Sequence, residues 1–161
     1  LRRLPLDNAG AKPLAARWRI VPLAVVGVIW LASVLMLISG WPPGTYLSLE
    51  LSWALLPIMV QIGFGGDILR RYARLVILSL GSMTLYLCLA DLLAIGSGTW
   101  EIDPAQSLHW LIAGVLPLEE IVFFLLTNTL ITFGVVLLLA EETRVRFGEI
   151  RAAVFRRGRQ A

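Results

Sequence analysis

Charged residues are scarce in this chain of 161 residues: they make up 16% of it, whereas hydrophobic residues make up 58%. A soluble globular domain contains about 25% charged and about 45–50% apolar residues. The mean hydropathy of +0.79 agrees with this imbalance. The composition excludes a soluble enzyme with a solvated surface and a disordered tail, and it predicts an integral membrane protein.

Cysteine and histidine each occur once, as Cys88 and His109. A single cysteine excludes a disulfide framework, and a single histidine excludes a histidine-rich metal cage. Glu119 and Glu120 could share a metal with His109, but Pro117 separates them in the sequence, and no metal site is expected. The chain also lacks the Gly-x-Gly-x-x-Gly, Gly-x-Ser-x-Gly and Cys-x-x-Cys motifs, so the sequence does not indicate dinucleotide, serine-hydrolase or dithiol chemistry.

Positive charge is in small excess, with a net charge of only +3 despite a pI of about 9.6. The 14 basic residues lie in blocks between hydrophobic runs, which is typical of the cytoplasmic loops of membrane proteins. Nucleic acid is therefore not an expected partner. Lys12 is the only lysine among these residues, a bias typical of GC-rich bacterial genomes, and the expected location is the cell membrane of a bacterium.

Four hydrophobic segments are long enough to cross a bilayer, which requires about 20 apolar residues in a helix. Pro117 divides the last apolar block, and because proline is tolerated in the first turn of a helix, the final span is expected to begin there. Residues 107–116 are expected to form a short interfacial or re-entrant helix before it. The predicted fold is an all-α polytopic membrane bundle. Its four spans are residues 20–40, about 47–69, about 75–95 and 117–140.

The basic blocks also predict an orientation. They precede the first span, separate the second from the third and follow the fourth, and the other two loops contain no basic residue. Since cytoplasmic loops carry an excess of Lys and Arg, both ends of the chain are predicted to be cytoplasmic. The expected organisation is a basic segment 1–19, an extra transmembrane helix 20–40, a three-helix membrane domain 45–142 and a basic tail 143–161.

Four carboxylic acids fall within the outer half of the predicted membrane region, where inserting a charge costs a few kcal/mol. Glu50 begins the second span, Asp91 ends the third, and Glu119 and Glu120 begin the fourth. A helix dipole favours the last pair by at most about 1–2 kcal/mol, and no cation lies on that side. At least one of the pair is therefore expected to carry a proton when buried, which suits a general acid.

Asp67 lies apart from these acids, near the inner side of the predicted membrane region. Arg70 and Arg71 follow it by about one helical turn, so a structural ion pair with one of them is expected. Pro117 is likewise assigned a structural role at the start of the last span. The stripe formed by Gly81, Thr84 and Cys88 is interpreted as a helix-packing surface.

Two motifs identify a resemblance. The sequence DLLAIGSGTWEIDP occupies residues 91–104, LPLEEIVFFLLTN occupies residues 116–128, and WALLP and QIGFGGD precede them at 53–57 and 61–67. Together they resemble the membrane-embedded lycopene cyclase domain, which occurs in heterodimeric actinobacterial carotenoid cyclases and in fungal fusions with phytoene synthase. The resemblance covers about residues 45–142 and is strongest to the C-terminal repeat of the tandem proteins.

This resemblance implies an isomerase that closes the linear ends of lycopene into rings without net redox change. No cofactor is evident, and a reduced flavin acting as a non-redox helper is left open. The domain usually occurs twice, but this chain contains one Pro-Leu-Glu-Glu motif. A homologous subunit, a lost N-terminal segment or a second copy of the chain is therefore expected to complete the unit. The other expected partners are an apolar carotenoid and membrane lipid.

Ring closure requires an acid, a base and surroundings that stabilise a carbocation. Glu120 is the expected acid because it shares a helix face with Phe123 and Phe124, and Glu119 or Asp91 is expected to hold or remove the second proton. The aromatic residues could instead face lipid, and the polar ones could pack against a neighbouring helix. The expected substrate-binding residues are Trp53, Gln61, Trp100, Phe123, Phe124, Thr127 and Asn128.

Two other functions are compatible with the sequence. A non-catalytic subunit could complete the fold while its partner holds the working acid. A proton-relay or transport component is the second, since acids inside a membrane also mark proton pathways. A relay should carry acids through the full membrane depth, whereas only Asp67 lies on the inner side here.

Overall fold

The computed structural model describes residues 15–99 and 103–158. Most of this chain is helical, and four of its helices are long and apolar enough to cross a membrane, which confirms the predicted all-α fold. The expected basic tail is largely a fifth helix. The helices are α1 (Arg17–Ile38), α2 (Thr45–Arg71), α3 (Ala73–Gly96), α4 (Leu118–Leu139) and α5 (Glu141–Gly158), with short 3-10 turns η1 (Pro42–Gly44) and η2 (Pro104–Gln106).

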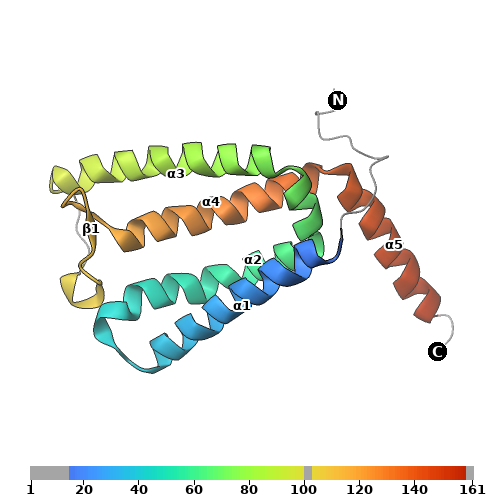
Figure 1. The fold of residues 1–161 in the computed structure, drawn as a ribbon, viewed down its shortest axis with the longest axis horizontal. Helices are drawn as coiled ribbons and strands as arrows, with labels where there is room; N and C mark the ends of the chain where they lie inside the picture. Colours follow the sequence, from blue (N-terminus) through green and yellow to red (C-terminus); the bar gives the residue numbers. More distant parts are fainter. Residues whose placement is uncertain (1–14, 100–102, 159–161) are drawn as a thin grey trace.

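The four long helices lie side by side in the order α1, α2, α4, α3 (Figure 1). α4 packs against α2 on one side and against α3 on the other, while the main packing partner of α1 is α2. Although α2 and α3 are consecutive in the chain, they make few contacts with each other because α4 lies between them. The last helix is therefore the central one, and residues on it can face either neighbour.

The segment before α4 is a β-hairpin, and the helix expected over residues 107–116 was wrong. Strand β1 (Leu111–Ile112) pairs antiparallel with β2 (Leu116–Pro117). The turn between them contains Ala113 and Gly114, whose φ angles are 53° and 72°. Positive φ at two consecutive turn residues matches the twist of a hairpin and is incompatible with a right-handed helix.

The buried core is small, and most large hydrophobic side chains lie on the outward surfaces of the helices. Val60, Leu78, Leu93 and Leu138 are each more than two-thirds exposed. Helices that are hydrophobic on all sides belong in a lipid environment when they are not buried in protein. Two buried clusters join the helices, one around Ala54, Leu55, Ile58, Ile62 and Leu126, the other around Ile68, Leu69, Tyr72, Val76, Val136, Leu137 and Ala140.

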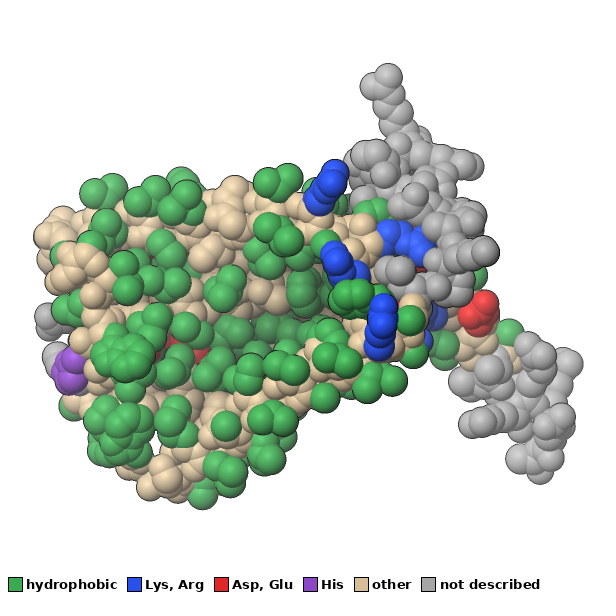
Figure 2. Space-filling model, in the orientation of Figure 1, with side chains coloured by type: hydrophobic (Ala, Val, Ile, Leu, Met, Phe, Trp, Pro, Cys, Tyr) green, Lys and Arg blue, Asp and Glu red, His purple; other side chains and the backbone are tan. Residues whose placement is uncertain are grey.

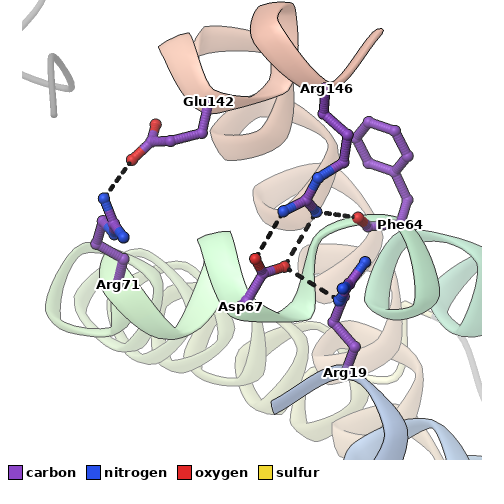
Figure 3. Close-up of polar contacts among 6 residues, drawn as sticks. All are labelled: Arg19, Phe64, Asp67, Arg71, Glu142 and Arg146. Carbon is purple, nitrogen blue, oxygen red and sulfur yellow. Dashed lines mark hydrogen bonds and ion pairs between the residues drawn. The ribbon is translucent and has the colours of Figure 1, made fainter. Parts of the chain in front are cut away.

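The arginines of the described chain gather at one end of the molecule, where α1 begins, α2 ends and α3 begins (Figure 2). This region is called the basic end below. Asp67 is buried there, and Arg146 of α5 binds both of its carboxylate oxygens at 2.6 and 3.0 Å (Figure 3). Arg19 of α1 lies 3.6 Å away on the same carboxylate.

The expected pairing of Asp67 with Arg70 or Arg71 was therefore wrong. Arg71 instead binds Glu142 of α5 at 3.1 Å (Figure 3), and the Arg70 guanidinium lies over the ring of Trp18. Arg146 of α5 takes the place expected for Arg70 or Arg71, and it comes from a segment that the sequence analysis described only as a basic tail. The resulting ion pair ties α1, α2 and α5 together at the basic end.

Glycine permits a close contact between α1 and α2 at the basic end. A Cβ atom on Gly66 would lie 2.7 Å from the backbone oxygen of Trp18 and 3.3 Å from the Cα of Arg19. These are backbone atoms, so they cannot move aside as a flexible side chain would. By contrast, a Cβ atom on Gly63 would meet only the Leu23 side chain, at an ordinary 3.7 Å.

Gly66→Ala is therefore expected to destabilise the protein by about 1–3 kcal/mol, the usual cost of forcing extra volume into a packed contact. Gly63→Ala, one helical turn earlier, is the matched control and is expected to be neutral or stabilising because alanine is the better helix former. Thermal unfolding in detergent, followed by circular dichroism, measures both. Equal midpoints for the two variants would contradict the proposed close contact.

Candidate active site

The four acids expected in the outer half of the membrane region are all buried. Glu50, Asp91, Glu119 and Glu120 are 4%, 7%, 0% and 3% exposed, and they come from α2, α3 and α4. They are called the acidic cluster below. In Figure 2, acidic surface is visible in red inside a hollow that hydrophobic side chains surround. The helix order explains the cluster, since the start of α4 lies between the start of α2 and the end of α3.

Glu119 is anchored by the segment that precedes the hairpin. Its Oε1 atom accepts hydrogen bonds from the Ser107 hydroxyl at 3.0 Å and from the Leu108 backbone N–H at 2.6 Å. Its Oε2 atom is buried and has no hydrogen-bond donor among the described residues. One carboxylate oxygen is therefore fixed in place, and the other is left available to a substrate or a shared proton.

Glu120 forms its hydrogen bond with a residue of α2, unlike Glu119. The Tyr46 hydroxyl, in the first turn of α2, donates to its Oε1 atom at 3.4 Å. Phe123 and Phe124 follow on α4 with their ring centroids 5.8 Å apart in an edge-on arrangement, and both are partly buried. Glu120 therefore combines a weak hydrogen bond with neighbouring aromatic rings on its own helix.

Glu50 and Asp91 complete the cluster from the flanking helices. Glu50 is close enough to Glu119 and Glu120 to interact with them electrostatically, and Asp91 interacts with Glu120. Neither carboxylate oxygen of Glu50 has a hydrogen-bond donor within the part of the chain that the structure describes. Sequence reasoning placed Glu50 in the membrane region but did not include it among the site residues.

Two polar residues expected to bind substrate form hydrogen bonds between helices. Asn128 of α4 donates to the Thr84 hydroxyl of α3 at 3.1 Å, and Gln61 of α2 donates to the Leu130 carbonyl of α4 at 3.0 Å. Thr127 bonds within α4, donating to the carbonyl of Phe123 at 2.8 Å. Polar side chains often join membrane helices in this way, so these contacts hold α4 between its neighbours.

Of the two predicted tryptophans, the structure describes only Trp53. Trp53 is 46% exposed on α2, even though Glu50 precedes it by one turn and is buried. Trp100 falls outside the described residues. Over the residues that are described, no group of three His, Cys, Asp or Glu side chains has the geometry to hold a metal ion. His109, the one histidine, is exposed.

Ser107→Ala is expected to release Glu119 from one of its two donors. A hydrogen bond to a charged group contributes about 1.5–3 kcal/mol, so the variant should unfold at a measurably lower temperature in detergent. Ser97→Ala is the control, because Ser97 is exposed at the end of α3 and bonds only with its local neighbours. An unchanged midpoint for Ser107→Ala would show that Leu108 alone positions the carboxylate.

Comparison with known proteins then identifies relatives. The chain is 38% identical over 120 residues to a bifunctional lycopene cyclase/phytoene synthase of Podospora anserina, covering 74% of this chain and 20% of that protein. It is 35% identical over 118 residues to the protein of the same description from Colletotrichum graminicola, covering 70% and 19%. The chain is a homologue of the lycopene cyclase domain. It spans about a fifth of the length of these relatives.

A third relative with that description, from Phycomyces blakesleeanus, is 38% identical over 84 residues, which is 51% of this chain and 14% of the relative. No family model and no solved structure matches the chain. These three relatives are fungal, and each is described as bifunctional. The match falls on their lycopene cyclase domain.

Sequence reasoning missed two residues that form hydrogen bonds with the acidic cluster, Tyr46 and Ser107. Tyr46 stands 74 residues from Glu120, and Ser107 stands 12 residues from Glu119 across the hairpin. No helical spacing connects either pair, because each contact depends on tertiary structure.

Proposed function

We propose that this chain is a carotenoid cyclase subunit that closes the linear ends of lycopene or a related carotenoid into rings. The observation that carries the proposal is a cluster of four buried acids inside membrane-spanning helices, in a chain homologous to lycopene cyclases. An apolar substrate reaches such a site from the lipid phase. A carboxylic acid in a site without bulk water is suited to protonate a carbon–carbon double bond.

The proposed reaction conserves all atoms. A proton from Glu120 adds to the terminal double bond of the polyene and leaves a tertiary carbocation. A nearby double bond of the same chain attacks this cation, which closes the six-membered ring and moves the positive charge into it. Loss of a proton to Glu119 or Asp91 restores a neutral product, an isomer of the substrate. Phe123 and Phe124 would stabilise the cation through their ring faces, each by about 0.5–2 kcal/mol.

The assignment of acid and base rests on the contrast between the two adjacent glutamates. Two donors from the loop hold one oxygen of Glu119, whereas Glu120 has the single long contact with Tyr46. Glu120 is therefore freer to move toward a substrate and donate. The second oxygen of Glu119 has no donor among the described residues and is the proposed acceptor of the proton that is lost.

A homologous subunit or a second copy of the chain is proposed to complete the site. The four long helices form a row rather than a closed bundle, which leaves the acidic cluster in a hollow open on one side (Figures 1 and 2). A second domain of the same kind would close such a hollow and enclose the polyene.

We also propose that the basic end, where the arginines gather, faces the cytoplasm of a bacterium, in keeping with the positive-inside rule.

Expression in a host that accumulates lycopene tests this function. The chain is produced alone and together with a homologous second subunit, and the extracted pigments are separated by liquid chromatography. Cyclic carotenoid is expected from the pair. Lycopene that remains unchanged under both conditions, with the protein present in the membrane, would reject the cyclase and leave a proton-relay role to be examined. Reconstitution without added flavin shows whether the reaction requires that helper.

A further inference from the structure

A second hollow lies at the basic end, away from the acidic cluster. It has a volume of about 260 Å³, is open to the surroundings of the protein, and is bordered by α1, α2, α3 and α4. Its walls are apolar and include Pro22 of α1, Ile62 of α2, Val76 of α3 and Phe133 of α4. The Arg70 guanidinium and the Trp18 ring also border it, where the helices reach the end of the membrane-spanning region. The cavity therefore has an apolar interior and a positively charged edge, which is called the rim below.

The rim carries unbalanced positive charge. The guanidinium of Arg70 lies 4.8 Å from the centroid of the Trp18 ring, and that of Arg17 lies 5.6 Å from the same centroid. Two cations therefore share one aromatic ring. In the described part of the chain neither has an acidic partner, and neither does the exposed Arg74 nearby in sequence. The neighbouring Arg71 is engaged with Glu142, so positive charge is left at the mouth of the cavity.

The two halves of the cavity require different chemistry from one ligand. A hydrocarbon such as a carotenoid would pack against the apolar walls but carries no negative charge to pair with the arginines. A free phosphate ion would bind the arginines but leave the walls exposed. An anionic phospholipid supplies both an acyl chain and a phosphate, and basic pockets between membrane helices commonly bind such headgroups. Tryptophan at the same level is typical of the membrane–water boundary.

We propose that this cavity binds one anionic phospholipid, with an acyl chain against Ile62, Val76 and Phe133 and its phosphate at Arg70. A phosphate there accepts charge-assisted hydrogen bonds from the guanidinium, and the positive charge of Arg17, which lies over the same Trp18 ring, adds to the attraction. The bound lipid would fill the hollow that residues of all four long helices border. The site is separate from the acidic cluster and does not depend on the proposed reaction.

Native mass spectrometry of the protein in detergent tests the site. The protein is titrated with phosphatidylglycerol and, separately, with phosphatidylcholine of the same acyl chains. Phosphatidylglycerol is expected to bind more tightly, and Arg70→Gln is expected to weaken it about fivefold, in line with the usual contribution of one basic residue near a lipid surface. Arg144→Gln is the matched control, because its side chain is 71% exposed and paired with Glu141.

Three outcomes would overturn the proposal: equal binding of the two lipids, equal losses in the Arg70 and Arg144 variants, or displacement of phosphatidylglycerol by millimolar inorganic phosphate alone. Fluorescence provides a readout that does not depend on the Arg70 variant folding. Phosphatidylglycerol with brominated acyl chains is expected to quench the wild-type protein more than Trp18→Phe, because Trp18 borders the cavity. Equal quenching of the two proteins would reject the cavity as the lipid site.

Discussion

Glu120→Gln is expected to lower ring formation at least about 100-fold in the lycopene-accumulating host, the usual minimum contribution of a general acid. The amide keeps the size of the side chain and can still accept a hydrogen bond from Tyr46, so folding should be preserved. It cannot donate a proton to a double bond. The measurement is the ratio of cyclic to linear carotenoid at equal amounts of membrane-inserted protein, with the homologous subunit present throughout.

Glu141→Gln is the matched control for this experiment. Glu141 is also a glutamate near one end of α4, but it begins α5 at the basic end and forms an exposed ion pair with Arg144. Its replacement should leave the product ratio unchanged. If Glu120→Gln keeps normal activity while the corresponding change in the partner subunit abolishes it, this chain is a non-catalytic subunit and the assignment of the acid is wrong.

The Glu119→Gln variant tests whether Glu119 is the base that accepts the final proton. If Glu119 accepts the final proton, its amide should still permit protonation of the polyene and ring closure but not the usual proton loss, so a lower yield and rings whose double bond lies at another position are expected. The change also disturbs the contacts with Ser107 and Leu108, which makes the stability of this variant a required second measurement. A normal yield of cyclic carotenoid from both amide variants would contradict any role for the pair.

The position of the acids near one end of the membrane region could be predicted from the sequence, because Asp91, Glu119 and Glu120 all lie close to a span end. Their burial could not, since it depends on which helix face packs against a neighbour. The contacts within the cluster could not be predicted in the same way. Tyr46 reaches Glu120 from another helix, and Ser107 reaches Glu119 from the segment before the hairpin, so both contacts depend on how these elements are placed in space.

The hairpin illustrates a second limit of sequence reasoning. The apolar run before Pro117 has the composition of a helix, and its only turn signal is the pair Ala113–Gly114. Glycine adopts positive φ readily, but alanine does so rarely, so the conformation at Ala113 could not be inferred from residue type. Because Glu119 is anchored by this region, the missed hairpin concealed part of the site as well as part of the fold.

Helical spacing predicted which residues share one face of a helix, but not what that face contacts in the folded protein. Gln61 and Asn128 were predicted to bind substrate, and each is hydrogen-bonded to an adjacent helix. Trp53 follows Glu50 by three residues, on the same side of α2, and is nearly half exposed. A stripe spans a wide angle on the helix surface, so its two edges face different surroundings once α4 occupies the space between α2 and α3.

The second large effect is expected at the basic end, where Asp67→Asn should destabilise the protein by about 3–5 kcal/mol. Asp67 is 5% exposed, and its carboxylate neutralises Arg146 on α5 and Arg19 on α1. Removing one member of a buried ion pair leaves the other charged without compensation, which costs far more than the pair itself contributes. Helix α5 should also be held less firmly, since Asp67 binds Arg146 with two hydrogen bonds and the Arg71–Glu142 ion pair then remains.

Thermal unfolding in detergent measures the loss of stability, and limited proteolysis between α4 and α5 measures the release of α5. Glu141→Gln again serves as the control, because its exposed ion pair with Arg144 contributes less than about 1 kcal/mol. The double variant Asp67→Leu with Arg146→Met should recover part of the loss, since apolar residues of similar size often replace a buried ion pair without cost. Equal midpoints for Asp67→Asn and Glu141→Gln would show that the two ion pairs contribute alike and that burial of Asp67 has no energetic consequence.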